Sequence, residues 1–380
     1  MRALTGGSGY DPLRRAAGRN LAAQQAPDRS SPIRYAFTLA KGQRMLSGQL
    51  QRREFITLLG GAAAMWPLAA RAQQRRNAQE GRMYRIGFLF AGTIALRPQA
   101  REFWRKLQDL GYVEGKNIMA EVREAYGDVS RLPKLAAEIV DTHPDVIVAV
   151  TTPAVAAAKM ATQTIPIVMA IISDPIGSGF VKSLARPGAN ITGPSTLQTE
   201  IIPKRVQLIK EMLPGLTTVG MLWNENNTVN RSQAQLAEQA AKSLDIPFRS
   251  FRMRALEDLS PALNSAIEEH VSALLVAGDA LLFDHRADVI AFSLANRIPT
   301  FHTLPEEAVD GAVAAYGSEL ADEYRRAAPY VAKILAGAAP ADLPVDQATR
   351  FQLVLNMKTA QAIGLKIPDS IILRADEVIE

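Results

Sequence analysis

The sequence predicts an α/β protein built from two doubly wound, parallel-sheet lobes. Short runs rich in Val and Ile, such as Asp145–Val150 (DVIVAV) and Ile167–Ile172 (IVMAII), alternate with helix-like segments. An almost wholly apolar strand is typical of a parallel sheet that is buried on both faces. After the turn-rich stretch Asn190–Ser195 (NITGPS) the strand–helix alternation begins again. The chain is therefore expected to have two similar halves.

The first half follows from these patterns in chain order. The segment 99–110 carries apolar residues at helical spacing and stops at Gly111, which predicts an amphipathic helix. A Pro at the first helical position favours a helix start at Pro153. Strands are expected at 85–90, 117–123, 145–150 and 167–172, and helices at 99–110, 131–143 and 154–161.

The second half repeats the rhythm, with a polar loop after most strands. Ser260 is a suitable cap for the helix that begins at Pro261. In this half, strands are expected at 218–223, 248–252, 273–277 and 299–302, and helices at 201–213, 231–244, 261–270 and 284–296. After it, strands are expected at 311–316 and 351–355, and helices at 319–336 and 357–363.

Polar residues follow the two strands named first. Thr151, Thr152 and Pro153 come directly after one strand, and Ser173 and Asp174 after the next. Ligands of open α/β sheets bind at the carboxyl edge of the strands, and helix N-termini favour anionic groups such as a carboxylate. We therefore expect the two Thr residues to hold a ligand carboxylate and Asp174 to face an amino group. The alternative is that these residues are ordinary helix caps.

Other strand ends supply further candidates. Three aromatic residues end strands and are expected to sandwich an apolar or planar group: Phe90, Trp223 and Tyr316. Polar contacts from the second half are expected from Asn224, Asn226 and Asp279. Trp223 could equally belong to the core, and the two Asn residues could equally be helix caps.

Composition excludes several function classes. The 380 residues include no Cys and 4 His, and none of the His residues has metal-protease spacing. No GxSxG or phosphate-binding loop occurs. We therefore expect no catalytic residues, no metal and no cofactor. The net charge of +5 arises in residues 1–82, which contain 14 basic and 4 acidic residues, whereas the rest is mildly acidic and predicts no nucleic-acid partner.

The N-terminal region reads as an export signal. Arg52 and Arg53 precede an apolar run, Thr57–Ala70, and a small-x-small cleavage site ends at Ala72. Residues 45–72 are therefore predicted to be a twin-arginine-type signal peptide whose removal leaves a periplasmic protein that begins at Gln73. The alternative is an uncleaved membrane anchor. Residues 1–44 fit no signal, and we expect a wrongly assigned or disordered extension before Met45.

Several segments together resemble a known family. They are LGYVEGKN at 110–117, TPAVAAA at 152–158, SDPIGSGFVKSLARPGAN at 173–190, ITG at 191–193, LWN at 222–224 and RADEVIE at 374–380. This set resembles the ABC-transporter substrate-binding family of the type I periplasmic-binding-protein fold, related to tryptophan and tyrosine importers. The family often has Gly at the position of Thr151, and Tyr-Gly-Pro where this chain has Tyr316, Gly317 and Ser318.

The resemblance implies a venus-flytrap protein with a three-crossing hinge near residues 193–195, 305–311 and 339–344. Lobe one is expected at 84–194 plus 311–339, and lobe two at 195–308 plus 340–380. It further implies a small-molecule solute, permease subunits in the membrane as partners, and a monomer. The alternative is a periplasmic ligand-sensing protein or an enzyme on a doubly wound α/β fold.

Overall fold

The computed structural model describes residues 82–380, so the predictions for the extension, the signal peptide and its cleavage lie outside the described residues. The first lobe is built on a five-stranded parallel sheet of order β2-β1-β3-β4-β5. Its strands are β1 (Tyr84–Phe90), β2 (Ile118–Glu124), β3 (Val146–Val150), β4 (Ile167–Ala170) and β5 (Ile191–Thr192).

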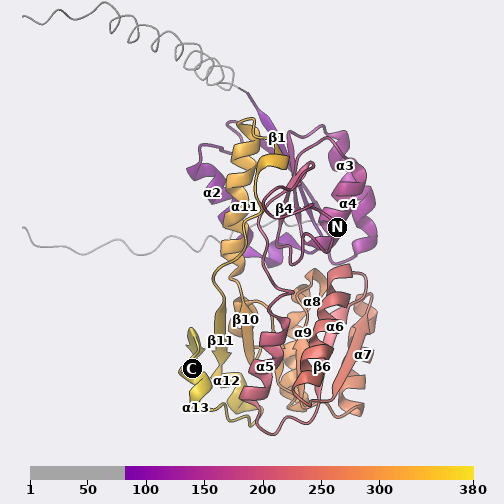
Figure 1. Cartoon of the computed structure of the whole chain (residues 1–380), viewed down its shortest axis with the longest axis vertical. Helices are drawn as coiled ribbons and strands as arrows, with labels where there is room; N and C mark the ends of the chain where they lie inside the picture. Colours follow the sequence, from indigo (N-terminus) through magenta and orange to yellow (C-terminus); the bar gives the residue numbers. More distant parts are fainter. Residues whose placement is uncertain (1–81) are drawn as a thin grey trace, which may run out of the picture. The chain divides into compact units, whose positions relative to one another are not determined.

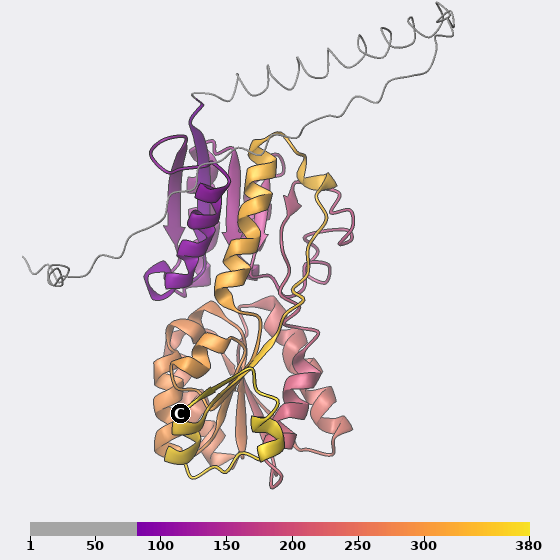
Figure 2. The same ribbon diagram turned by 90° about the vertical axis from the view of Figure 1, so that its left-hand side faces the viewer.

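Helices cover both faces of this sheet, as the apolar strands require. Alternate strand residues such as Phe88 and Val148 pack against α2 (Arg101–Asp109) and α11 (Leu320–Leu335), which lie side by side (Figures 1 and 2). The intervening residues, such as Leu89, face α3 (Leu132–Asp141) and α4 (Thr152–Ala161). The doubly wound arrangement is confirmed for this lobe.

The second lobe is built on a seven-stranded sheet of order β12-β11-β10-β9-β8-β6-β7. Its pairs are parallel except for β10 with β11. Its strands are β6 (Val219–Asn224), β7 (Phe248–Met253), β8 (Ala273–Val276), β9 (Thr300–His302), β10 (Ala314–Gly317), β11 (Gln352–Asn356) and β12 (Glu377–Ile379).

One large apolar cluster forms the core of the second lobe and includes Met221, Leu275 and Val289. Its helices are α5 (Ile202–Met212), α6 (Thr228–Ser243), α7 (Leu259–Glu268), α8 (Ala280–Asp284), α9 (Arg286–Asn296), α10 (Pro305–Val309), α12 (Met357–Ala362) and α13 (Asp369–Ile372). Short 3₁₀ turns complete the chain: η1 (Ile94–Leu96), η2 (Pro98–Ala100), η3 (Val129–Arg131), η4 (Leu256–Asp258) and η5 (Pro340–Asp342). Within residues 82–380, no helix is long and apolar enough to cross a membrane.

The chain passes between the lobes three times, but the second passage differs from the prediction. The expected boundary assigned residues 311–339 to lobe one, whereas β10 pairs with β9 and β11 of the second sheet. The passage therefore lies between Gly317, which ends β10, and Leu320, which begins α11. The expected crossing at 305–311 is wrong because an apolar run such as GAVAAY fits a buried strand in either sheet.

The third passage also lies later than predicted. Leu343 accepts a hydrogen bond of 2.6 Å from the hydroxyl of Thr192, and the backbone N–H of Val345 donates to the carbonyl of Leu184 at 2.7 Å. Val345 is buried in the core of the first lobe. The chain therefore stays in this lobe through Val345 and does not leave it at residue 340.

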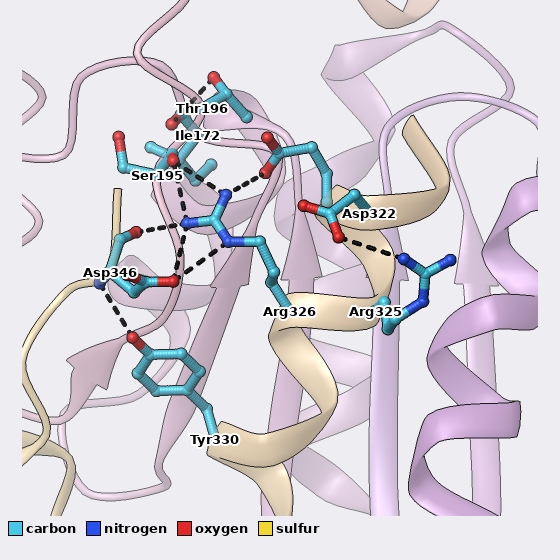
Figure 3. Close-up of polar contacts among 9 residues, drawn as sticks. Ile172, Ser195, Thr196, Asp322, Arg325, Arg326, Tyr330 and Asp346 are labelled. Atoms are coloured by element: carbon cyan, nitrogen blue, oxygen red, sulfur yellow. Dashed lines mark hydrogen bonds and ion pairs between the residues drawn. The ribbon is translucent and has the colours of Figure 1, made fainter. Parts of the chain in front are cut away.

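Two side chains of α11 join the first and third passages (Figure 3). Arg326 donates hydrogen bonds to the carbonyl oxygens of Ser195 at 3.4 Å and Asp346 at 2.8 Å. The Tyr330 hydroxyl donates to the carbonyl of Pro344 at 2.8 Å and accepts from the N–H of Asp346 at 2.9 Å. Both passages are thus anchored to one helix of the first lobe.

Candidate ligand-binding site

A cavity lies where loops at the carboxyl ends of strands from both sheets meet. Loops after β1, β3 and β4 supply the first-lobe side, and loops after β6, β8 and β9 supply the second-lobe side. The lining residues are Phe90, Arg97, Thr151, Thr152, Ile171, Ser173, Gln198, Asn227, Val229, Gly278, Asp279, Ala280, Phe283, Thr303, Leu304 and Leu320. The space open to the centres of water-sized spheres is about 60 Å³, which is room for roughly five water molecules at about 10–15 Å³ each.

Thr151 forms the first-lobe wall of the cavity in a conformation that is unusual for a branched side chain. Its φ of 81° and ψ of 154° lie in a region that is essentially restricted to Gly. Gly, which the resemblance implies at this position, adopts such a conformation without strain. The Thr151 hydroxyl is buried and has no hydrogen-bond partner within the described residues. Backbone strain and an unpaired buried hydroxyl are both typical of ligand-binding positions.

The helix that follows reinforces this wall. α4 begins at Thr152, and Thr151 accepts the first helical hydrogen bond, from the N–H of Val155 at 3.1 Å. The earliest N–H groups of a helix have no partner within the helix and carry partial positive charge. Thr152 is 4% exposed and lines the same cavity. This side of the cavity therefore suits an anionic group.

Asp279 supplies the second-lobe wall. Its Oδ1 accepts from the N–H of Leu281 at 2.9 Å and from Nδ2 of Asn224 at 3.1 Å. Its Oδ2 accepts from Nδ2 of Asn227 at 2.9 Å. Because the carboxylate can only accept, the Asn227 amide must present its NH₂ group to it. The Asn227 Oδ1 is consequently left buried and unpaired in the part of the chain that the structure describes.

Gln198, on the first passage between the lobes, is the third unsatisfied polar residue of the lining. Its Oε1 accepts from the guanidinium of Arg205, which also donates to the carbonyl of Tyr316 at 2.8 Å. Burial lowers the pKa of Arg205 to about 9, so the guanidinium is still charged at neutral pH. Arg205 thereby orients Gln198 and leaves its Nε2 as a buried donor with no partner among residues 82–380.

The charged residues of the cavity lining differ in whether an opposite charge pairs with them. Arg97 and Asp279 are its charged residues. Arg97 forms an ion pair with Asp284, and the two side chains are 4% and 5% exposed. Asp279 is bound by neutral donors alone among its hydrogen bonds. The uncompensated charge of the lining is therefore the Asp279 carboxylate, which favours a cationic ligand group.

Two of the three predicted aromatic contacts do not line the cavity. Trp223 is 4% exposed in the second-lobe core, and its Nε1 donates to the hydroxyl of Ser250 at 2.8 Å. Tyr316 packs against the ring of Phe351, with centroids 6.2 Å apart. A strand-end aromatic can point to either face of its sheet, and both of these pack within the second lobe. Phe90 does line the cavity, where Phe283 takes the place expected for the other two.

Several predicted polar contacts also fall outside the lining. Asp174 accepts from the N–H of Gly177 at 2.7 Å and closes its own turn, and Pro153 serves as an early residue of α4. Asn224 is 1% exposed and reaches the site only through Asp279. Asn226 donates to the carbonyl of Arg254 at 2.9 Å. The predicted residues that line the cavity are Phe90, Thr151, Thr152, Ser173 and Asp279.

Sequence reasoning missed four lining residues that matter for the chemistry: Arg97, Gln198, Asn227 and Phe283. Asn227 stands in the polar run after β6 and could have been included on the same ground as Asn226. Arg97 and Phe283 lie in loops or short helices without a distinctive pattern, so no sequence signal marks them.

Two α/β lobes with a cavity at the carboxyl ends of their strands define a class, the two-lobed binding proteins for small molecules. Residues 95–379 match the model of the ABC transporter substrate-binding protein family, and the chain belongs to that family. Its members are substrate-binding proteins rather than enzymes, as predicted for this chain, and they act outside the cytoplasm with membrane permeases as partners.

Individual proteins resemble the chain over most of their length. A tyrosine-binding protein of Clostridioides difficile is 26% identical over 264 residues, covering 70% of this chain and 76% of the relative. A conserved domain protein of Vibrio cholerae is 28% identical with a TM-score of 0.74, over 78% of this chain and 100% of its own. The ABC domain of Streptococcus pneumoniae in complex with L-Trp is 25% identical with a TM-score of 0.71, over the same shares.

Proposed function

We propose that this protein captures a free α-amino acid in the cavity between its lobes and delivers it to an ABC importer. The observation that supports the proposal is that the two walls of the cavity favour ligand groups of opposite charge. One wall combines the α4 N-terminus with the free hydroxyl of Thr151, and the other presents the carboxylate of Asp279. A zwitterion places a carboxylate against the first wall and an ammonium group against the second.

The unpaired groups of the lining support the same ligand class. Gln198 Nε2 can donate to a ligand carboxylate, and Asn227 Oδ1 can accept from a ligand ammonium group. Buried polar atoms are normally satisfied, so their pairing by a ligand would add to affinity. Two relatives are described with amino acids, one as a tyrosine-binding protein and one in complex with L-Trp. Asp279 thus takes the role that the sequence assigned to Asp174.

Derivatised amino acids test the proposal. A thermal-shift screen of the purified protein against free amino acids should find a ligand, and calorimetry should then compare that ligand with its N-acetyl and carboxamide derivatives. Each derivative removes one charge, and losing one charge-assisted hydrogen bond costs about 1.5–3 kcal/mol, or roughly tenfold to a hundredfold in affinity. If both derivatives bind as tightly as the free amino acid, the zwitterion assignment is wrong.

We also propose that the protein works as a periplasmic monomer in import. Both walls of the cavity come from a single chain, so the site is complete without a second copy. Arg52 and Arg53, which lie outside the described residues, would direct export by the twin-arginine route, with cleavage after Ala72. Changing both arginines to Lys should leave precursor in the cytoplasm, and unchanged export would rule out this route.

A further inference from the structure

A planar cation of the protein itself occupies the aromatic part of the cavity. Arg97, between η1 and η2, places its guanidinium carbon 4.6 Å from the ring centroid of Phe90 and 4.4 Å from that of Phe283. Phe90 ends β1 in the first lobe, whereas Phe283 belongs to α8 of the second lobe. The space between the two aromatic rings that line the cavity is therefore occupied by the Arg97 side chain. Its guanidinium stacks on the rings in the geometry by which such rings hold a planar ligand group.

Arg97 is held in this place by contacts to both lobes. Its guanidinium donates to the carbonyl of Thr93 at 3.0 Å and to the carbonyl of Ala280 at 3.1 Å, in addition to its ion pair with Asp284. Asp284 also accepts from the N–H of Thr93 at 2.9 Å. Arg97 is 4% exposed, so this network is buried. An arrangement with this many bonds fixes the guanidinium far more firmly than stacking alone would.

We propose that Arg97 is a specificity-determining residue that excludes aromatic side chains, so that the ligand is an amino acid with a short side chain. This inference rests on the proposed function. The space left beside Arg97 is about 60 Å³ for the centres of water-sized spheres, which suits a small ligand. An aromatic ligand would have to expel the guanidinium and leave the Asp284 carboxylate buried without its countercharge, which is strongly unfavourable.

Arg97 is not the partner of the ligand carboxylate in this scheme. Its charge is already matched by Asp284, and its donors are directed to that carboxylate and to two backbone carbonyls. Its role is to fill volume at a neutralised site. A substitution that keeps the volume should therefore preserve selectivity even when the charge is lost.

Two matched double variants separate volume from charge. Arg97→Ala with Asp284→Asn (the Ala/Asn variant) empties the space between the rings. Arg97→Met with Asp284→Asn (the Met/Asn variant) fills this space with an uncharged side chain. Asn at position 284 keeps an acceptor for the N–H of Thr93 and avoids an unpaired buried carboxylate. Circular dichroism and thermal melting establish that both variants are folded.

Calorimetry with alanine and phenylalanine gives the first readout. The parent should bind alanine at least a hundredfold more tightly than phenylalanine. The Ala/Asn variant should gain at least tenfold in phenylalanine affinity, and the Met/Asn variant should stay within threefold of the parent. If the parent binds phenylalanine as tightly as alanine, the inference is wrong. This measurement needs no variant, so it is decisive even if a variant does not fold.

Indole gives a second readout that does not depend on the amino-acid assignment, since it carries neither carboxylate nor amine. It should raise the melting temperature of the Ala/Asn variant and leave the parent and the Met/Asn variant unchanged, because an emptied apolar site binds small aromatic molecules. If indole stabilises the Ala/Asn variant but no amino acid binds any form, the proposed function fails and the aromatic site stands. If indole stabilises none of the three proteins, the inference about Arg97 is wrong.

Discussion

The Nδ2 atom of Asn227 donates a hydrogen bond of 2.9 Å to the Oδ2 atom of Asp279, across two loops of the second lobe. This bond fixes the amide so that its Oδ1 is left as an acceptor with no partner among residues 82–380. One hydrogen bond thus positions both the carboxylate and the amide oxygen that the proposed ammonium group would contact.

Asn227→Ala should weaken amino-acid binding by roughly tenfold, since removing one hydrogen-bond partner of a buried group costs about 1–3 kcal/mol. Asn226→Ala is the matched control. Its Nδ2 donates to the carbonyl of Arg254, away from the cavity lining, so its affinity should equal that of the parent. Calorimetry with the identified ligand measures both, and equal losses in the two variants would contradict the placement of the site.

Thr151→Gly should stabilise the protein while it weakens binding. Gly adopts a φ of 81° without strain, and the net gain is about 0.5–2 kcal/mol, which is the strain released less the backbone entropy of Gly. The lost hydroxyl should reduce ligand affinity. Thr151→Ala also loses the hydroxyl but keeps the strain, so it should not raise the melting temperature. An equal thermal gain for both variants would show that the backbone is unstrained.

Glu306 should make stability fall as the pH rises. Its Oε1 accepts from the N–H of Leu320 at 2.8 Å, across the second passage between the lobes. Burial raises its pKa to about 7, so the folded state favours the protonated form. Protonation of Glu306 therefore stabilises the folded state fully at a pH below the pKa of this group in the unfolded chain, near 4.5. This stabilisation is lost as the pH rises through about 7.

Glu306→Gln keeps an acceptor for Leu320 and removes the charge. Urea unfolding should find this variant about 1–3 kcal/mol more stable than the parent at pH 8 and nearly equal to it at pH 4.5. The exposed Glu238 provides the control, and Glu238→Gln should reproduce the pH dependence of the parent. A Glu306→Gln variant with the parent's pH dependence would contradict the sign of this effect.

Arg326→Met should destabilise the protein by about 2–4 kcal/mol, because it removes a buried ion pair partner and two carbonyl contacts. The lost partners are the carboxylates of Glu323 at 3.1 Å and Asp346 at 3.2 Å. The carbonyls of Ser195 and Asp346 are lost as well (Figure 3). Arg325→Met is the neighbouring control, since Arg325 is 41% exposed and surface pairs contribute about 0–1 kcal/mol. Chemical denaturation compares the two, and equal losses would show that the Arg326 network does not hold the hinge.

The sequence by itself determined the alternation of strands and helices and one edge of the cavity. Val146–Val150 is an apolar run followed at once by Thr151 and Thr152, and the carboxyl end of a buried parallel strand can only deliver the next residues to that edge of the sheet. The same local logic placed Ser173 after β4 and Asp279 after β8. These assignments depend on a few consecutive residues, which is why they could be predicted.

Only the tertiary structure decided which distant segments meet. The apolar run of β10 satisfies either sheet, and its pairing with β9 and β11 depends on long-range hydrogen bonds. Trp223 points into the second-lobe core because its Nε1 finds Ser250 on the neighbouring strand. Arg97 and Asp284 are 187 residues apart in sequence, and neither flanking pattern specifies the other. Their ion pair forms because folding removes both charges from water, and each buried charge then requires the opposite charge beside it.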